Sequence, residues 1–264
     1  MSRDKYTLYQ AAVQDPTEDV NIYASMYESA RGRRPKVLRE DFCGTFAFSC
    51  AWVKAHPDNT AFSLDLDPEP LAYGKKHNLS KLTSSEKKRL HVAKKNVMSV
   101  TSPKSDLIVA NNFSFFIFKQ RADLVRYFSF GRRSLAKGGM MVVEMAGGAE
   151  MMKKSREQRV VVTNSGQKYT YVWEQKSYHP VSSNAVYAIH FTFPDGTKMK
   201  DAFVYDWRLW SIAEVRECMA EAGFRQTAVY WERYALGEPT GHYSRGEDMP
   251  NDTFYLAYVA GENI

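Results

Sequence analysis

The fold is decided by the stretch Leu38-Arg39-Glu40-Asp41-Phe42-Cys43-Gly44-Thr45-Phe46. A strand predicted over 36–42 ends in an acidic pair, a turn of small residues follows, and a helix is predicted over about 46–55. A turn of this kind lets backbone N–H groups approach a ligand closely at the N-terminus of a helix. The turn holds one glycine, Gly44, so the dehydrogenase fingerprint G-x-G-x-x-G is absent.

A second strand, predicted over Thr60–Leu66, carries acids at its carboxyl end, Asp65 and Asp67. In a nucleotide-binding sheet, an acid at this place accepts hydrogen bonds from two ribose hydroxyls, because a carboxylate offers two acceptor oxygens. We therefore expect Asp65 to bind a ligand. Asp67 precedes Pro68, and it suits the N-cap of the following helix equally well.

Strands and helices alternate through the first 150 residues. A helical segment over 1–35 ends at the breaker Gly32–Pro35, and the later elements are a helix over 121–135 and strands over 90–93, 106–110 and 140–145. This alternation favours an α/β fold with a doubly wound, mostly parallel, Rossmann-like sheet of seven strands.

The pattern changes between 151 and 205. β-rich segments lie there at 159–163, 168–174, 185–193 and 198–205. We expect an antiparallel β cap that interrupts a sheet domain made of 36–150 and 206–264. After the cap, a helix is predicted over 211–222 with Ser211 as its N-cap, and two strands follow over 226–231 and 253–259.

Composition places the chain among globular proteins. Of 264 residues, 44% are hydrophobic and 25% are charged, which excludes disordered and fibrous classes. The chain lacks a long apolar run and an apolar signal segment, so we expect a cytoplasmic protein without a membrane span. The three cysteines are scattered, and the six histidines form no metal-binding pair, so we expect neither disulfides nor a metal.

The net charge is +6, which leaves a nucleic-acid partner open. The basic doublets are spread along the chain, however, and solvated surfaces explain them more simply. Asp65-Leu66-Asp67 also has the D-x-D form of metal-dependent glycosyltransferases, although its place at a strand tip favours ribose binding. No G-x-S-x-G is present, which argues against a serine hydrolase.

In their order along the chain, these segments resemble the class I S-adenosylmethionine-dependent methyltransferases. Glu40–Phe46 is similar to that family's E/D-x-G-x-G-x-G loop, with Cys43-Gly44-Thr45 matching a common C-G-T core, and Asp65 matches the ribose acid. The resemblance continues through Asp106–Phe113, the segment that faces the methyl donor in that family. Two further stretches also resemble the family: 135–139 is similar to its L-x-x-G-G motif, and 222–224 to its A-G-F motif.

The resemblance implies that S-adenosylmethionine binds across the strand tips, with the N-terminal helical segment folded over it. The residues it implies as cofactor contacts are Glu40, Phe42, Cys43, Gly44, Asp65, Leu66, Asn96, Val97, Asn111, Phe113 and Tyr9. The chain departs from the family where Phe42 and Phe46 replace two loop glycines. It departs again where Asn96 stands in place of an acid that often contacts adenine.

No residue is assigned as catalytic, because methyl transfer depends mainly on alignment and on the exclusion of water. An aromatic wall suits a sulfonium, and Phe42, Phe113 and Phe115 are candidates for it. The cap is rich in tyrosine and tryptophan, which fits an enclosed pocket for a small-molecule acceptor. We expect acceptor contacts from His190, Tyr205 and Arg208.

Three alternatives stay open. The first is that the acceptor is RNA or protein, bound by the basic surface. Asn111-Asn112-Phe113 faintly resembles the N-P-P-F/Y motif of enzymes that methylate nucleic-acid bases, but it lacks the two prolines. The second is that the chain binds the cofactor without catalysing a reaction. The third is that the cap serves as a homo-oligomer interface rather than as a lid.

Overall fold

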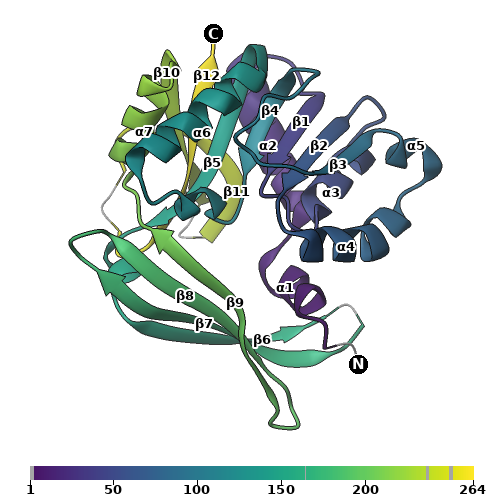
Figure 1. Ribbon diagram of the computed structural model, residues 1–264, viewed down its shortest axis with the longest axis vertical. Coiled ribbons are helices and arrows are strands. Elements are labelled where there is room, and N and C mark those ends of the chain that lie inside the picture. The colour runs from purple at the N-terminus through teal and green to yellow at the C-terminus, as the bar shows by residue number, and fades with distance from the viewer. Residues whose placement is uncertain (1–2, 164, 236–237, 250–251) are drawn as a thin grey trace.

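The computed structural model describes residues 3–163, 165–235, 238–249 and 252–264. Figure 1 shows a large sheet covered by helices and a second sheet that stands apart below it. The large sheet contains, in spatial order, β11 (Glu238–Arg245), β10 (Gln226–Ala235), β12 (Tyr255–Asn263), β5 (Leu135–Gly147), β4 (Ser105–Ala110), β1 (Val37–Asp41), β2 (Thr60–Asp65) and β3 (Leu90–Lys94).

Pairing in the large sheet confirms the doubly wound, mostly parallel architecture. Strands β1 to β5 are parallel, whereas β12 lies antiparallel between β5 and β10. The expectation of seven strands is wrong by one, because β11 pairs antiparallel with β10 at the edge. Its sequence is polar and contains proline and glycine, so the alternation that identifies a half-buried strand is missing.

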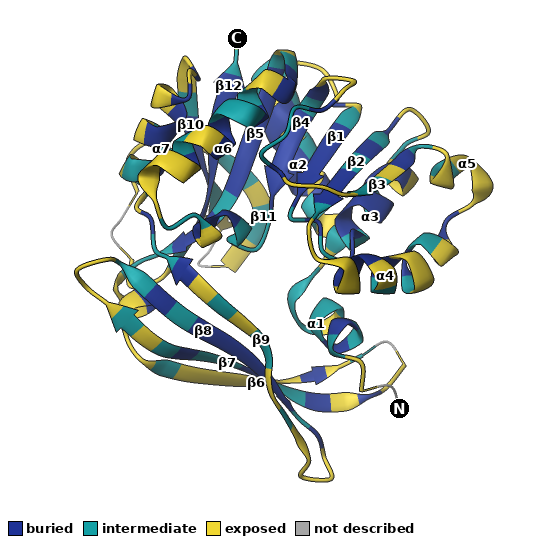
Figure 2. Ribbon diagram, in the orientation of Figure 1, coloured by how far each residue is buried: buried dark blue, intermediate teal, exposed yellow. Residues whose placement is uncertain are grey.

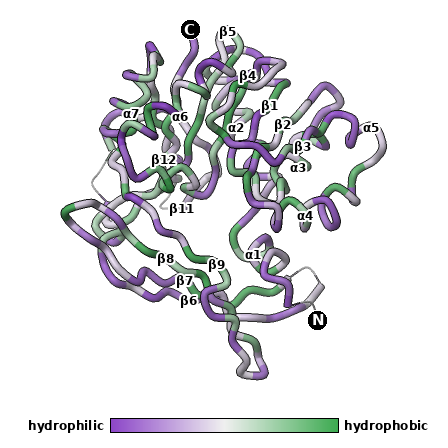
Figure 3. The backbone as a smooth tube through the Cα atoms, viewed as in Figure 1, coloured by the Kyte–Doolittle hydropathy of each residue, from purple (hydrophilic) through white to green (hydrophobic). Residues whose placement is uncertain are grey.

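Helices cover both faces of the large sheet. One face is packed by α6 (Arg121–Ser134) and α7 (Ile212–Glu221), and the other by α2 (Pro16–Arg31), α3 (Ala47–Ala55) and α4 (Pro68–His77). The short α5 (Ser84–Lys87) lies before β3. Figure 2 shows that buried residues concentrate in the central strands, and Figure 3 shows the hydrophobic segments that form them.

The second sheet is the predicted cap. It contains β6 (Ser155–Val162), β7 (Lys168–His179), β8 (Asn184–Thr192) and β9 (Lys198–Arg208), all antiparallel and in chain order. Because β6 follows β5, the cap emerges at the edge where the parallel strands end. The N-terminal α1 (Lys5–Val13) lies between the cap and the large sheet (Figure 1). No helix among the described residues is long and apolar enough to cross a membrane.

A buried ion pair lies under the loop that follows β1. Arg39 is fully buried, and its Nε donates to Asp41 at 2.7 Å. Its other nitrogens donate to the carbonyls of Val97 and Ser99 and to the Ser134 hydroxyl. The Asp41 carboxylate therefore belongs to the core and does not face a ligand beside Glu40.

Arg39→Met should lower the free energy of unfolding by about 3–5 kcal/mol, because it leaves Asp41 buried without its cation. Urea denaturation measures the change. The control Arg34→Met removes an exposed arginine that pairs with Glu28, and it should cost no more than about 1 kcal/mol. A loss below 1 kcal/mol in Arg39→Met would contradict this account.

Candidate active site

The loop between β1 and α3 has an unusual backbone. Phe42, Gly44 and Phe46 all have positive φ angles, of 55°, 51° and 47°. Glycine adopts this region freely, whereas an aromatic residue does so only when its surroundings hold it there. A Cβ added at Gly44 would meet no atom within 4 Å, so this turn of the loop faces open space.

Packing explains how two phenylalanines occupy glycine-like positions. The Phe46 ring is fully buried against α4, where a Cβ added at Gly74 would lie 2.4 Å from Phe46 Cε1. The centre of the Phe42 ring lies 5.9 Å from the centre of the Phe118 ring and 5.7 Å from that of Tyr127. The glycine that allows close approach here therefore stands on the helix at Gly74 instead of in the loop.

Asp65, at the end of β2, joins two loops. Its Oδ2 accepts the Gly44 amide at 2.7 Å, and its Oδ1 accepts the Asp67 amide at 2.9 Å. Each oxygen keeps a lone pair for a further donor. Asp67 accepts the Glu69 amide as the N-cap of α4, the role that its place before Pro68 suggested.

Glu40, at the end of β1, is tied to α3. It accepts hydrogen bonds from the backbone amide of Ser49, at 3.0 Å, and from the Ser49 hydroxyl. Ser63 of β2 donates in turn to Ser49. Burial raises the pKa of Glu40 to about 8, although the bonds from Ser49 oppose the rise. These contacts fix the Glu40 carboxyl at the tips of β1 and β2.

A cavity of about 500 Å³, which we call the loop cavity, lies at these strand tips. It is lined by the β1–α3 loop, by Asp65, Asp67 and Asn111, and by side chains of α1 and β9. This is the place where ligands bind in open α/β sheets.

A second cavity, of about 380 Å³, lies beside the first under the cap, and we call it the cap cavity. Its lining includes Phe113, Glu144, Arg159, Tyr171 and Trp173. The two cavities share the lining residues Tyr9, Asn112, Tyr205 and Trp207. The Tyr9 and Tyr205 hydroxyls share a hydrogen bond, so this shared wall joins α1 to β9.

Helix α1 holds the cap over the sheet. Gln10 donates to the Thr45 hydroxyl in the loop at 2.8 Å, and Lys5 forms an ion pair with Glu69 of α4. On the cap side, the Tyr169 hydroxyl donates to the Leu8 carbonyl at 2.5 Å. Leu8 is also fully buried in the hydrophobic cluster of the cap.

The structure brings most of the predicted cofactor contacts together. Those that line the loop cavity are Glu40, Phe42, Cys43, Gly44, Asp65, Asn111 and Tyr9. Phe113 lines the cap cavity instead. Phe115, a candidate for the aromatic wall, is fully buried in the core.

Leu66, Asn96 and Val97 do not line the loop cavity. Leu66 is 55% exposed. The Asn96 carboxamide accepts the Met98 amide at 2.8 Å, which closes a local turn. The Val97 side chain is buried, and its carbonyl accepts a hydrogen bond from Arg39.

Among the predicted acceptor contacts, only Tyr205 lines the loop cavity and the cap cavity. His190 lies on the outer face of the cap, where its Nε2 is 2.8 Å from Glu174 and its Nδ1 accepts the Asp201 amide. The Arg208 guanidinium lies 3.7 Å from the centre of the Trp210 ring and pairs with Glu214. Neither side chain is brought to the cavities.

Two residues were missed that the sequence could have indicated. Trp207 lies on the same face of β9 as Tyr205, because side chains alternate along a strand. The same alternation places His190 and its neighbour Ile189 on opposite faces of β8, and Ile189 is the one that lines the cap cavity. Glu144 interrupts the apolar run Met140–Met145, and an acid within a buried strand is itself a signal.

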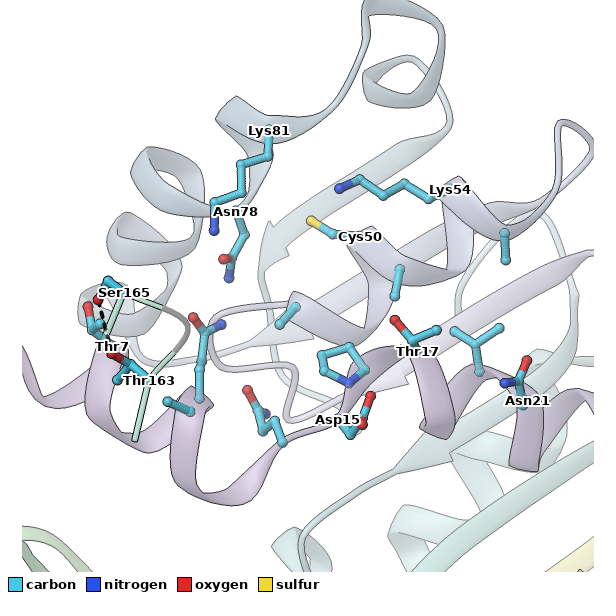
Figure 4. Close-up of a pocket in the computed structure, with 18 of the residues that line it drawn as sticks. Thr7, Asp15, Thr17, Asn21, Cys50, Lys54, Asn78, Lys81, Thr163 and Ser165 are labelled. Carbon is cyan, nitrogen blue, oxygen red and sulfur yellow. Dashed lines mark hydrogen bonds between the residues drawn. The ribbon is translucent and has the colours of Figure 1, made fainter. Parts of the chain in front are cut away.

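A larger groove, of about 900 Å³, lies between the N-terminal helices and α3. Figure 4 shows its polar lining, which includes Asp15, Lys54, Asn78 and Lys81. None of its described lining residues comes from the carboxyl end of a parallel strand, so it lacks the position at which this architecture binds ligands. The described residues also contain no cluster of side chains suited to a metal ion.

No family model and no curated protein matches the sequence. Solved structures do match. CalS10, an amino pentose methyltransferase from Micromonospora echinaspora solved with S-adenosylmethionine, is 16% identical, with a TM-score of 0.69 over 99% of this chain and 98% of that one. DesVI from Streptomyces venezuelae is 20% identical, with a TM-score of 0.70 over 99% of both chains.

A further match is an S-adenosylmethionine-dependent methyltransferase from Clostridium acetobutylicum. It is 14% identical, with a TM-score of 0.69 over 97% of this chain and 96% of that one. At these identities the likeness concerns the fold. The chain has the fold of the class I S-adenosylmethionine-dependent methyltransferases.

Gly74→Ala should destabilise the protein by about 1–3 kcal/mol, because the new methyl group overlaps the Phe46 ring and the Thr45 carbonyl. The same change in an open helix would stabilise by about 1 kcal/mol. Chemical denaturation measures the difference, with Lys75→Ala on the same helix as control. If Gly74→Ala is as stable as the parent protein, the packing argument fails.

Proposed function

We propose that this chain is an S-adenosylmethionine-dependent methyltransferase that acts on a small-molecule acceptor. The observation that carries the proposal is the pair of adjoining cavities with a common wall of Tyr9, Asn112, Tyr205 and Trp207. Methyl transfer requires a donor and an acceptor held end to end with water excluded. The loop cavity provides the donor position, and the cap cavity provides the acceptor position.

The residues of the loop cavity fit S-adenosylmethionine. Asp65 would hold the two ribose hydroxyls with the lone pairs that its backbone partners leave free. The open space beside Gly44 admits the ligand close to the backbone. When bound, the cofactor supplies an activated methyl group on a sulfonium. The aromatic rings of Tyr9, Tyr205 and Trp207 can attract that positive charge at the shared wall.

The cap cavity favours a small acceptor. Its volume of about 380 Å³ lies within the range of small-ligand sites, about 300–1,000 Å³. Its lining joins aromatic side chains with both acidic and basic groups, whereas an RNA site would require a continuous basic surface. The amino pentose methyltransferase among the structural matches also acts on a small molecule, which supports this choice.

We divide the chain by function along the same lines. In this proposal the segment 1–35 supplies α1 as a cover for the donor, and residues 36–150 and 206–264 form the cofactor-binding domain. Residues 151–205 form the cap, and its last strand continues to Arg208.

Transfer of a labelled methyl group tests the proposal directly. The full chain is incubated with methyl-labelled S-adenosylmethionine and a metabolite extract, and labelled small molecules are expected after ultrafiltration. Label found only in RNA or protein would overturn the choice of acceptor. Binding of the cofactor without any transfer would leave a binding protein in place of an enzyme.

Asp65→Ala should weaken S-adenosylmethionine binding by about 2–3 kcal/mol, because a charged acceptor of two hydrogen bonds is lost. Isothermal titration calorimetry measures the dissociation constant, and a thermal melt checks that the variant folds. Asp123→Ala, on the exposed side of α6, is the control and should bind as the parent chain does. An unchanged affinity in Asp65→Ala would refute the ribose assignment.

Tyr171→Ala opens the wall of the cap cavity without touching the loop cavity. We expect the rate of methyl transfer at limiting acceptor to fall by about tenfold or more, since a buried aromatic contact is lost. The affinity for S-adenosylmethionine should stay within about twofold. Tyr234→Ala, which removes a tyrosine that is 65% exposed on β10, is the matched control. Equal losses of cofactor and acceptor binding would contradict the division of roles.

A further inference from the structure

We propose that the acceptor is a primary or secondary amine, and that Glu144 binds its ammonium group beside the wall shared by the two cavities. This inference rests on the proposed methyltransferase function, and it names the substrate class of that site.

Glu144 stands where the acceptor must meet the donor. It lies near the carboxyl end of β5 and lines the cap cavity. Its Oε2 accepts the backbone amide of Asn112 at 2.6 Å, and Asn112 lines both cavities. The carboxylate is therefore anchored by one oxygen at the junction of the cavities. Among the described residues, Oε1 has no hydrogen-bond donor.

A second carboxylate, that of Asp19, lies close enough to Glu144 to feel its charge. Asp19 of α2 is partly buried, and burial followed by the negative charge of Glu144 raises the pKa of Asp19 to about 7. Within the described parts of the chain, no lysine, arginine or histidine forms an ion pair with either residue. Both side chains are only partly exposed, and carboxylates removed from water are normally paired with a cation. Here the described residues supply none, which leaves that place for a cationic ligand.

The charged groups around Glu144 do not fill this role. The groups that face it, or share its cavity, are Asp19 and Tyr23 from α2, Tyr9 from α1, Tyr243 from β11, Tyr258 from β12, and Glu157 and Arg159 from β6. Arg159 is the only cation among these described groups. Its guanidinium donates to the Ala12 carbonyl and lies 5.3 Å from the centre of the Tyr171 ring.

The rest of the lining also suits an ammonium ion. Tyr9, Tyr171, Trp173, Tyr205 and Trp207 present aromatic rings to the cap cavity. Aromatic faces attract cations, and a carboxylate adds a directed charge. An anionic acceptor would instead meet Glu144 and Glu157 in the same cavity. Of the classes of small acceptor, an amine is therefore the one that this lining favours.

The bound ammonium must lose a proton before it can react. That proton passes to the Glu144 carboxylate, whose pKa is raised by burial. The nitrogen lone pair then forms a bond to the methyl carbon, while the C–S bond breaks and its electron pair stays on sulfur. The products are the methylated ammonium and neutral S-adenosylhomocysteine. The positive charge thus moves from sulfur to nitrogen, next to Glu144, and the proton on Glu144 leaves to water when the product departs.

Selective acylation tests the acceptor class. A metabolite extract is treated with acetic anhydride in aqueous bicarbonate, which acetylates primary and secondary amines and also some hydroxyls. Hydroxylamine then removes the acetyl groups from the hydroxyls and leaves the amines blocked. Label transfer from S-adenosylmethionine should occur with the untreated extract and fall at least tenfold with the treated one. Equal transfer to both would overturn the amine assignment and leave the methyltransferase function intact. No transfer to the untreated extract would overturn both.

Variants test the role of Glu144 with the untreated extract at saturating cofactor. Glu144→Gln should lower the rate of label transfer by about 10- to 100-fold, the range expected for a charged hydrogen bond. Its dissociation constant for S-adenosylmethionine should stay within about twofold. Asp19→Asn should lower the rate less, and it keeps the test informative if Glu144→Gln fails to fold. The matched control, Glu217→Gln at an exposed position of α7, should leave the rate unchanged.

The outcome that would overturn the role of Glu144 is specific. A folded Glu144→Gln enzyme that transfers label within about twofold of the parent chain would contradict it. If Glu144→Gln does not fold, an unchanged rate in Asp19→Asn would contradict the proposal that Glu144 and Asp19 together bind the ammonium group. A parallel loss of cofactor binding in Glu144→Gln would place the residue in the donor site and would also overturn the proposal.

Discussion

The carboxylate of Asp65 fixes the relation between the loops that follow β1 and β2, because it accepts a backbone amide from each of them. The loop after β1 in turn receives α1 through the bond from Gln10 to Thr45. Helix α1 carries the cap, through the Leu8 carbonyl and the bond between Tyr9 and Tyr205. The shapes of both cavities therefore depend on one side chain, which the proposed function also assigns to the ribose.

The loop shows how a glycine-poor sequence reaches a glycine-rich geometry. Left-handed backbone at Phe42 and Phe46 costs about 1–3 kcal/mol each unless the surroundings compensate. Burial can offset this cost, since a fully buried aromatic side chain such as Phe46 contributes about 1.5–3 kcal/mol, and the partly buried Phe42 ring contributes less. The requirement for close packing has moved to Gly74, on the helix that receives the Phe46 ring.

The sequence predicted the elements whose patterns are local. Alternating strands and helices predicted a doubly wound, mostly parallel sheet, and the N-cap residue Ser211 located the start of α7. It did not predict β11, which lacks an apolar face. Nor did it reveal that Asp41 turns inward to Arg39, because the partners of a buried charge come from distant segments.

The candidate site divides in the same way. Residues in the loop and at the tip of β2 could be predicted, since strand ends and tight turns locate them in any sheet of this kind. Asn96 and Val97 were inferred from the resemblance alone; a local turn holds Asn96, and the buried Arg39 holds the Val97 carbonyl, away from the loop cavity. The acceptor side depended on which face of each cap strand points inward. That face follows from the period of two, which separates His190 from Ile189 and joins Tyr205 to Trp207.

The central claim is that one ligand spans the loop cavity with its reactive end at the wall of Tyr9, Tyr205 and Trp207. A crystal structure of the full chain with S-adenosylhomocysteine tests this claim most directly. The account predicts ribose hydroxyls within hydrogen-bond distance of Asp65 and the thioether sulfur at that wall. Density for the nucleoside away from Asp65, for example in the groove beside Lys54 and Lys81, would contradict it.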